Sequence, residues 1–256
     1  MKPASVSVYL RSLLFVVAYH LIGVVHSLLC LATAPFMSFE QRFRFVNLWT
    51  RATMWLLRHL NGVRVEVQGR ENLPEGEPVV VVANHQSQWE TFYLQLLVAP
   101  QATVLKRELL WVPFFGWGLA LLKPIAIDRS KPGGALKTIL RVGKARLQEG
   151  ISVVIYPEGT RQPPGMIGRF NNGGAMLACH AGVRLVPVAH NAGHCWPARS
   201  MLRHSGVITL VIGPAIETAG KAPKIVASEA ESWIREQAAD LPGSQTPPDR
   251  APDRTF

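Results

Sequence analysis

The chain has 256 residues, of which 48% are hydrophobic, so it can hold one large domain or two small ones with a full core. Its formal net charge of +10 predicts an anionic partner, either nucleic acid or a membrane or phosphorylated substrate. The sequence has no run of five or more Lys or Arg, no zinc-finger spacing and no RNA-binding aromatic signature, which argues against nucleic acid as the partner.

The first apolar segment, Ser12 to Phe36, contains no Asp, Glu, Lys or Arg and reaches the ~20 residues that cross a bilayer core. Lys2 and Arg11 precede it, as basic residues precede the apolar run of a cleaved signal peptide. The run exceeds the usual signal-peptide length and no small-x-small cleavage site follows it, so we expect it to be retained. It could span the membrane, dip into it, or form a hairpin in one leaflet about Pro35.

The second segment, Glu40 to Leu60, is predicted to be an amphipathic helix that stops at Asn61-Gly62. Arg44, Arg51 and Arg58 recur at intervals of seven and form one stripe beside Phe, Trp and Leu side chains. Such a helix suits the headgroup layer of an anionic membrane. The alternative is a helix packed on the protein's own core, with its arginines in solvent.

Arginine is more frequent after the first apolar segment than before it. By the positive-inside rule, this asymmetry predicts that the rest of the chain lies on the cytoplasmic side. We therefore expect residues 1–62 to be N-terminal membrane-associated helices that hold the protein at the inner (cytoplasmic) membrane.

Strand and helix patterns alternate from residue 63 to residue 240, which predicts an α/β domain with a mostly parallel central sheet flanked by helices. The expected strands are Val63–Val67, Val79–Ala83, Ala102–Leu105, Ile125–Ile127, Ser152–Tyr156, Arg184–Ala189 and Val207–Ile212. The expected helices are Trp89–Leu97, Gly134–Gln148, Gly173–His180 and Lys224–Ala239. Residues 241–256 are rich in Pro, Asp and Arg and are predicted to be a disordered tail.

The block from Asn84 to Glu90 stands where one predicted strand gives way to a helix. The strand before it is apolar and β-branched, as expected of a strand buried on both faces, and open α/β sheets bind ligands at the carboxyl ends of such strands. His85 and Glu90 are therefore candidates for acid–base chemistry. Ser87-x-x-Glu90 also fits a capping box, so the residue pattern favours catalytic orientation and helix capping equally.

Three more polar blocks follow predicted strands, at the edge of the sheet where substrates bind. The second block is Asp128-Arg129, preceded by Lys106 and by a Pro-, Gly- and Trp-rich turn from Val112 to Gly118. The third block runs from Tyr156 to Arg161, and the fourth from Val186 to Asn191.

The three cysteines, Cys30, Cys179 and Cys195, cannot all pair with one another and predict a reducing compartment. His190 and His194 have a His-x3-His spacing that also occurs in zinc sites. The sequence lacks a Cys-x2-Cys half to complete such a site, so we expect no metal.

The four blocks, in this order, make the chain resemble the 1-acyl-sn-glycerol-3-phosphate acyltransferase family, bacterial type, within the glycerolipid acyltransferase superfamily. That family carries an Asn-His-x4-Asp block, a Phe-Ile-Asp-Arg-like block, a Phe-Pro-Glu-Gly-Thr-Arg block and a Val-Pro-Val block. The resemblance extends from Val63 to Ile212. Two departures are visible, because Glu90 replaces the usual Asp and Asn171 replaces a frequent Lys.

The resemblance implies an enzyme of phospholipid biosynthesis that moves a fatty acyl group to the sn-2 hydroxyl of lysophosphatidic acid, giving phosphatidic acid. It implies that His85 is the general base and that Glu90 orients its imidazole, as in a Ser-His-Asp triad without the serine. The acyl group would pass directly from acyl-CoA or acyl carrier protein, as co-substrate, without an acyl-enzyme and without a cofactor. On this basis we favour orientation over capping for Glu90.

The phosphate of the acceptor requires fixed cations, for which Arg161 and Arg129 are the candidates and Lys106 a weaker third. The resemblance assigns Glu158-Gly159-Thr160-Arg161 to glycerol-phosphate binding, where Glu158 would bond the glycerol or fix Arg161 and Gly159 would permit close approach. Apolar residues near the second block are expected partly to line an acyl pocket: Leu109, Leu110, Trp111, Phe114, Phe115, Trp117, Leu119, Leu121 and Leu122.

Three other functions are compatible with parts of the sequence. The acceptor could be another lysophospholipid or a lyso-aminolipid, because cations that bind phosphate distinguish these headgroups poorly. A hydrolase could use His85 and Glu90 to activate water, but the sequence has no Gly-x-Ser-x-Gly elbow. A non-catalytic protein could use the basic helices and the phosphate pocket to bind anionic lipid.

Overall fold

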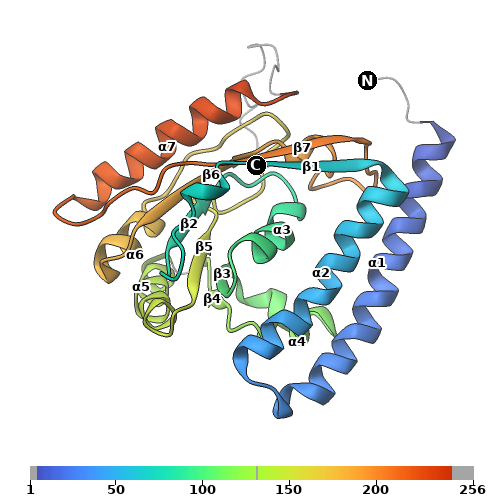
Figure 1. The fold of residues 1–256 in the computed structure, drawn as a ribbon, viewed down its shortest axis with the longest axis horizontal. Coiled ribbons are helices and arrows are strands. Elements are labelled where there is room, and N and C mark those ends of the chain that lie inside the picture. The colour runs from blue at the N-terminus through green and yellow to red at the C-terminus, as the bar shows by residue number, and fades with distance from the viewer. Residues whose placement is uncertain (1–4, 131, 244–256) are drawn as a thin grey trace.

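The computed structural model describes residues 5–130 and 132–243, and in it a single sheet has helices on both faces (Figure 1). The strands are Val63–Gln68 (β1), Val80–Ala83 (β2), Gln101–Lys106 (β3), Ile125–Ile127 (β4), Ser152–Ile155 (β5), Leu185–His190 (β6) and Gly206–Ile212 (β7). The helices are Val6–Thr33 (α1), Phe39–Asn61 (α2), Trp89–Leu97 (α3), Phe115–Ala120 (α4), Pro132–Gln148 (α5), Gly173–Ala181 (α6) and Pro223–Asp240 (α7).

The sheet has the order β1-β7-β6-β2-β5-β3-β4 among the described residues. All neighbouring strands are parallel except β6 and β7, which are antiparallel. The connection between β6 and β7 carries only a short 3-10 turn, and antiparallel neighbours need no crossover helix. The prediction of a mostly parallel sheet flanked by helices is confirmed.

Strand β2 lies between β5 and β6 and is buried on both faces. Val81 and Ala83 belong to the hydrophobic cluster on one face of the sheet, and Val80 and Val82 belong to the cluster on the other. Each fully buried valine contributes roughly 1.5–3 kcal/mol of hydrophobic stabilisation. The end of this strand is therefore a rigid support for the residues that follow it.

Helices α1 and α2 lie side by side and form the two-helix element expected at the N-terminus (Figure 1). α1 begins at Val6, earlier than predicted, and the chain turns through a 3-10 segment, Ala34–Phe36. α2 starts at a capping box in which the Ser38 hydroxyl accepts from the Gln41 amide, and it ends at Gly62 in the left-handed conformation.

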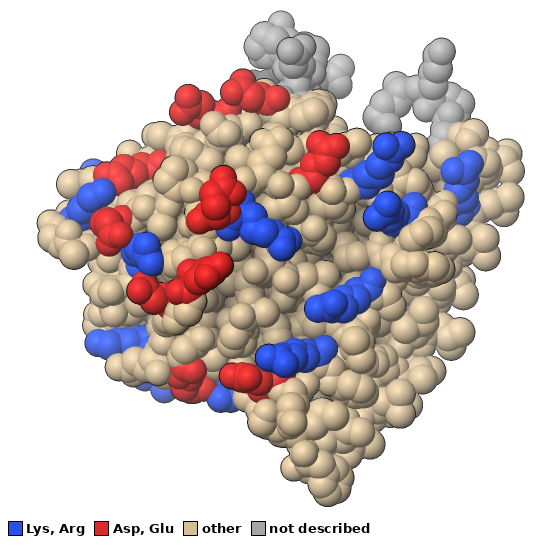
Figure 2. All heavy atoms as spheres, in the orientation of Figure 1, with Lys and Arg blue, Asp and Glu red and all other residues tan. Residues whose placement is uncertain are grey.

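The outer face of α1 leaves large apolar side chains in the open, including Leu14 at 59% and Leu21 at 64% exposure. The segment Val6–Phe36 is long and apolar enough to cross a membrane. Figure 2 shows the lower end of the α1–α2 pair without charged side chains on the visible face. These features indicate membrane association.

Helix α2 differs from α1 because much of its apolar surface packs on the protein itself. Phe43 and Leu57 are buried, while the arginine stripe Arg44, Arg51 and Arg58 is exposed. This packing fits the alternative of a core-facing helix with solvated arginines better than it fits a helix lying wholly in the headgroup layer. The division of the chain at residue 62 stays a prediction, since Leu57 and the sheet share one hydrophobic cluster.

Two segments differ from the sequence-based predictions. Helix α4 forms within the predicted turn, where a Cβ on Gly116 would lie 2.5 Å from the carbonyl oxygens of Leu109 and Leu110. Glycine at this position thus permits the close packing of two short helices. The predicted tail begins at Leu241, but Leu241 is buried and the Pro242 carbonyl accepts from Asn191 Nδ2. Residues 244–256 of that tail lie outside the described residues.

Candidate active site

His85 leaves the carboxyl end of β2 on a backbone that two separate segments fix. The amide of His85 donates to Glu158 Oε1 at 2.8 Å, and the carbonyl of His85 accepts from the Gln162 amide at 2.7 Å. Glu158 Oε2 also accepts from the Gly168 amide at 2.7 Å. The third sequence block therefore acts as a brace for the first.

Glu90 is fully buried at the start of α3 and bonds to the imidazole of His85. His85 Nδ1 lies 2.8 Å from Glu90 Oε1. The same oxygen accepts from the amides of Gln86, at 3.0 Å, and Ser87, at 2.8 Å. Burial raises the pKa of Glu90, but the nearby histidines and the hydrogen bonds from His85 and Ser87 bring the net pKa below its ordinary value.

An ionised Glu90 determines which nitrogen of His85 carries the proton. A carboxylate can only accept, so His85 Nδ1 donates to it and Nε2 keeps a free lone pair. His85 is thus arranged as a base at Nε2 with its conjugate acid stabilised at Nδ1. This is the hydrogen-bond pattern of the histidine in a Ser-His-Asp triad.

Glu90 makes one of the two hydrogen bonds of a capping box. Glu90 accepts from the Ser87 amide, as in a capping box, but the Ser87 hydroxyl accepts from Trp89 N rather than from the Glu90 amide. Oε1 of Glu90 therefore bonds both to the backbone of the turn and to the imidazole of His85. A bond that can orient the imidazole and a bond that caps the helix coexist in the structure.

Tyr156, at the end of β5, stacks on His85 with ring centroids 4.3 Å apart and an interplanar angle of 18°. Burial raises the pKa of the Tyr156 hydroxyl well above its ordinary value, and Glu90 raises it further, so the phenol stays protonated. Sequence patterns did not identify this contact. The position of Tyr156 directly before the Pro-Glu-Gly-Thr-Arg run, at a strand end, is the signal that could have found it.

The predicted basic residues follow three neighbouring strands. Arg161 Nε donates to the Ser87 carbonyl at 3.0 Å, which ties this guanidinium to the His85 block. Partial burial lowers the pKa of Arg129, Glu108 raises it and Arg161 lowers it. Lys106 is exposed and pairs with Glu108 at 3.4 Å.

The remaining predicted residues of the third block have distinct positions. Gly159 has a φ of +70°, a left-handed conformation that favours glycine in this turn. Thr160 is exposed. The oxygens of Glu158 accept from backbone amides, and burial raises the pKa of Glu158 to about 7 against the effect of those amides.

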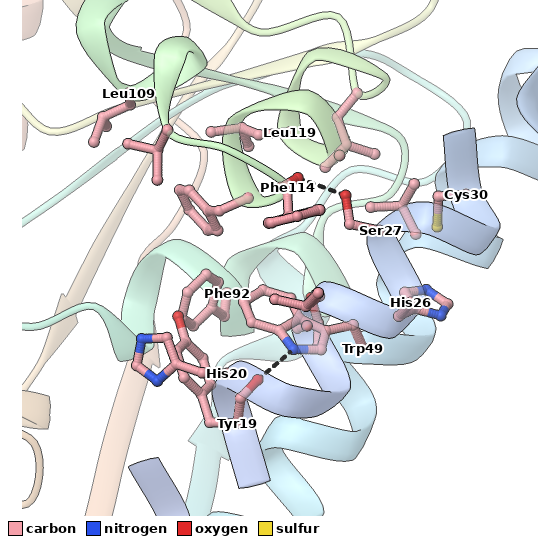
Figure 3. Close-up of a pocket in the computed structure, with 18 of the residues that line it drawn as sticks. Tyr19, His20, His26, Ser27, Cys30, Trp49, Phe92, Leu109, Phe114 and Leu119 are labelled. Carbon is pink, nitrogen blue, oxygen red and sulfur yellow. Dashed lines mark hydrogen bonds between the residues drawn. The ribbon is translucent and has the colours of Figure 1, made fainter. Parts of the chain in front are cut away.

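An apolar cavity of about 350 Å³ lies between α1, α2, α3 and α4 (Figure 3). Gln88, in the His85 block, lines it, so the cavity reaches the neighbourhood of the candidate base. It runs along α1 from Tyr19 to Cys30, which is 12 residues and about 16 Å of helix. The walls predicted from the sequence are Leu109, Phe114, Phe115, Leu119 and Leu122, and those missed include Tyr19, Gly23, Ser27 and Trp49.

Comparisons with known proteins identify the family of the chain. Residues 64–191 match the model of the family described as Acyltransferase. The chain is 46% identical over 236 residues to the 1-acyl-sn-glycerol-3-phosphate acyltransferase of Pseudomonas aeruginosa, covering 91% of each chain. It is 32% identical over 177 residues to the human 1-acyl-sn-glycerol-3-phosphate acyltransferase alpha, covering 68% of this chain and 62% of the human one.

A solved structure shows the same fold. The crystal structure of the 1-acyl-sn-glycerophosphate acyltransferase of Thermotoga maritima aligns with a TM-score of 0.76, covering 90% of this chain and 94% of that one at 23% identity. The sequence identity to the Pseudomonas enzyme and the family match, taken together, show that the chain is an enzyme of the 1-acyl-sn-glycerol-3-phosphate acyltransferase family.

Proposed function

We propose that this enzyme transfers a fatty acyl group from an acyl thioester to the sn-2 hydroxyl of lysophosphatidic acid, giving phosphatidic acid. The observation that carries this proposal is the buried hydrogen bond from His85 Nδ1 to Glu90 Oε1, which leaves Nε2 free as a base. The names of the Pseudomonas and human relatives support the choice of acceptor.

In the proposed reaction, His85 Nε2 takes the proton from the sn-2 hydroxyl as that oxygen attacks the thioester carbonyl. The new C–O bond forms, the C–S bond breaks, and the imidazolium returns its proton to the departing thiolate. Glu90 remains ionised and stabilises the imidazolium throughout. The transfer is direct and leaves no acyl group on the enzyme.

The phosphate of the acceptor would bind at the basic residues near this pair. Arg161 is the main candidate, because its bond to the Ser87 carbonyl holds it two residues from His85 and leaves its terminal nitrogens for phosphate. Arg129 and Lys106 add positive charge on the same edge. Two or more cations suit a phosphate monoester, which approaches a charge of −2 at neutral pH.

The acyl chain would lie in the cavity between α1 and α4. Its walls are mostly apolar and include Gln88, three residues after His85, so a thioester at His85 could place its chain along α1. Both acyl-CoA and acyl carrier protein could supply that chain. The exposed apolar face of α1 would hold the enzyme at the cytoplasmic side of the inner membrane, where the lysophospholipid resides.

Complementation tests the proposal. A bacterial strain that lacks its own 1-acylglycerol-3-phosphate acyltransferase should grow with the wild-type chain and with His180→Ala, an exposed histidine on α6. It should not grow with His85→Ala. Growth with His85→Ala would overturn the role of this residue as base.

An acceptor panel with the purified enzyme then tests the substrate. Lysophosphatidic acid should be acylated faster than lysophosphatidylethanolamine, lysophosphatidylcholine and a lyso-aminolipid. Equal rates would contradict the assignment of lysophosphatidic acid as the acceptor. Release of free fatty acid without any acceptor would indicate a hydrolase.

A further inference from the structure

A second buried histidine, His190, lies beside the candidate catalytic pair and has no part in the mechanism above. It is the last residue of β6, the strand next to β2, and is 1% exposed. His190 Nε2 lies 4.0 Å from Glu90 Oε2. Among the described residues, no group of three or more His, Cys, Asp or Glu is placed to hold a metal.

The hydrogen bonds of His190 fix its tautomer. The Ala192 amide donates to Nδ1 at 3.2 Å, so this nitrogen carries a lone pair. Nε2 therefore carries the hydrogen and donates to the Asn84 carbonyl at 2.8 Å. Burial lowers the pKa of His190, which keeps the ring neutral.

His190 and Asn84 form three hydrogen bonds, of which only one uses the imidazole. The Asn84 side chain donates to the His190 carbonyl at 2.9 Å and accepts from the His190 amide at 3.0 Å. These two bonds involve the main chain of residue 190 and would survive a change of its side chain. The imidazole adds the bond to the Asn84 carbonyl, directly before His85.

The second oxygen of Glu90 has a different environment from the first. Oε1 accepts from His85, Gln86 and Ser87, whereas Oε2 is buried without a hydrogen-bond partner among the described residues. The protonated edge of His190 is 4.0 Å away, too far for a hydrogen bond but close enough for its N–H dipole to favour a negative charge.

We propose that His190 is a positioning residue of the acyl-transfer site, which anchors the residue before His85 and helps to keep Glu90 ionised opposite it. This inference rests on the proposed roles of His85 and Glu90. His190 acts as a neutral donor and transfers no proton. Its side chain matters because its Nε2–H bonds to the Asn84 carbonyl at 2.8 Å and Nε2 lies 4.0 Å from the unpartnered oxygen of Glu90.

The other groups around the pair do not duplicate this role. Tyr156 and Glu158 are the further titratable groups on which Glu90 acts, and both lie on the β5 side of β2. Arg161 and Arg235 bond to backbone carbonyls at the same edge of the sheet. On the face of β6 that His190 shares with Val186 and Val188, the neighbouring aromatic ring is that of Trp89 in α3, which carries no charge and whose centroid lies 6.2 Å from that of His190.

A matched pair of variants separates the effect of the Nε2–H donor of His190 from the effect of its packing. In His190→Gln, the side-chain amide can occupy the position of Nε2 and donate toward Asn84. In His190→Asn, the shorter amide can accept from Ala192 in the place of Nδ1 but cannot reach the Asn84 carbonyl. Both variants keep the two main-chain bonds to the Asn84 side chain, so both should fold.

The measurement is kcat and kcat/KM against pH from 5 to 9, with purified enzyme and saturating acyl donor. We expect His190→Gln to keep the wild-type acidic limb. We expect His190→Asn to lose about 10-fold in kcat, the order of effect of losing one neutral hydrogen bond. Its acidic limb should move to higher pH by about half a unit, because the coupled His85–Glu90 pair takes up a proton more readily once the carboxylate loses the nearby N–H dipole.

Two controls make the result decisive. Val188→Ala, in the same strand, should lower the melting temperature without moving the acidic limb. Identical pH profiles for His190→Asn and His190→Gln, after correction for folded protein, would overturn the inference. His85→Ala tests the proposed function separately from the role of His190. If His85→Ala is active, His85 is not the base and the proposed function fails. If His85→Ala is inactive but His190→Asn behaves like the wild type, only the proposed role of His190 fails.

Discussion

The His85–Glu90 pair and the basic residues around it share one edge of the sheet but are held in different ways. Glu90 is fully buried, and three donors converge on one of its oxygens. Arg129 and Lys106 are exposed, and Lys106 forms a surface ion pair with Glu108.

This contrast suggests different roles, with the His85–Glu90 pair suited to catalysis and the basic residues suited to binding the acceptor. The pair is preorganised, so its geometry does not depend on substrate, and damage to it should appear in kcat. The basic residues are solvated and partly redundant, so damage to one of them should appear mainly in the apparent affinity for the acceptor. Arg161 joins the two regions through its bond to the Ser87 carbonyl.

The largest effect is expected for Glu90→Gln. All three donors to Glu90 reach Oε1, so a glutamine oxygen can keep the turn and the His85 tautomer while removing the charge. We expect kcat to fall about 100-fold with little change in melting temperature, because the imidazolium loses its counter-charge. Acyl-transfer assays and thermal melts measure the two quantities. An unchanged kcat with a lower melting temperature would show that Glu90 only caps the helix.

The next effect is expected for Arg161→Ala. Loss of one charge-assisted contact to phosphate should lower kcat/KM for the acceptor about 10-fold to 100-fold, mostly through KM. Arg161→Lys should recover part of the charge but not the Nε bond to Ser87. Arg129→Ala serves as the comparison and should lose only a few-fold. If the acceptor KM stays the same in Arg161→Ala, the phosphate binds elsewhere.

Local patterns predicted the parts of the site that are close in sequence. The β-branched run before Asn84 predicted a buried strand. The spacing of His85 and Glu90 allowed either their pairing or a helix cap, and the family resemblance favoured the pairing. The brace from Glu158 to His85 crosses 73 residues, and the contact of Asn84 with His190 crosses 106. Such contacts depend on the order of the strands in the sheet, which periodicity does not supply.

The walls of the apolar cavity were also predicted only in part from the sequence. The apolar segment after Lys106 predicted one wall, and five of its nine suggested residues line the cavity. The other walls come from α1, α2 and α3, and the sequence predicted a membrane role for the apolar residues of α1. A side chain that faces lipid and one that faces an apolar cavity are chemically alike, so only the packing of α1 against α4 separates them.

A smaller effect, on the free energy of unfolding, is expected from the titration of Glu158, which bonds to the amide of His85. Its folded pKa of about 7 lies above the ordinary value of about 4.3 for Glu. The folded state therefore keeps a proton that the unfolded state has lost between these values, and the contribution of Glu158 to the free energy of unfolding falls as the pH rises through that window.

The variant Glu158→Gln does not titrate and isolates this contribution. The stability advantage of the wild type over the variant should shrink by about 1–2 kcal/mol between pH 5 and pH 8, after allowance for screening by solvent. Urea unfolding at several pH values measures it. A constant difference across this range would mean that the carboxyl of Glu158 titrates near its ordinary pKa.

The smallest effect concerns the acyl chain and is expected for Cys30→Leu. Cys30 is buried at the end of the cavity away from Gln88, so a larger side chain there should exclude the end of a long acyl group. Each methylene left outside the apolar cavity forfeits about 0.8 kcal/mol, so preference should move several-fold toward shorter donors. Competition between two acyl thioesters of different length measures the ratio. Leu29→Phe, a neighbouring change on the exposed face of α1, should leave it unaltered, and an equal shift in both variants would place the chain outside this cavity.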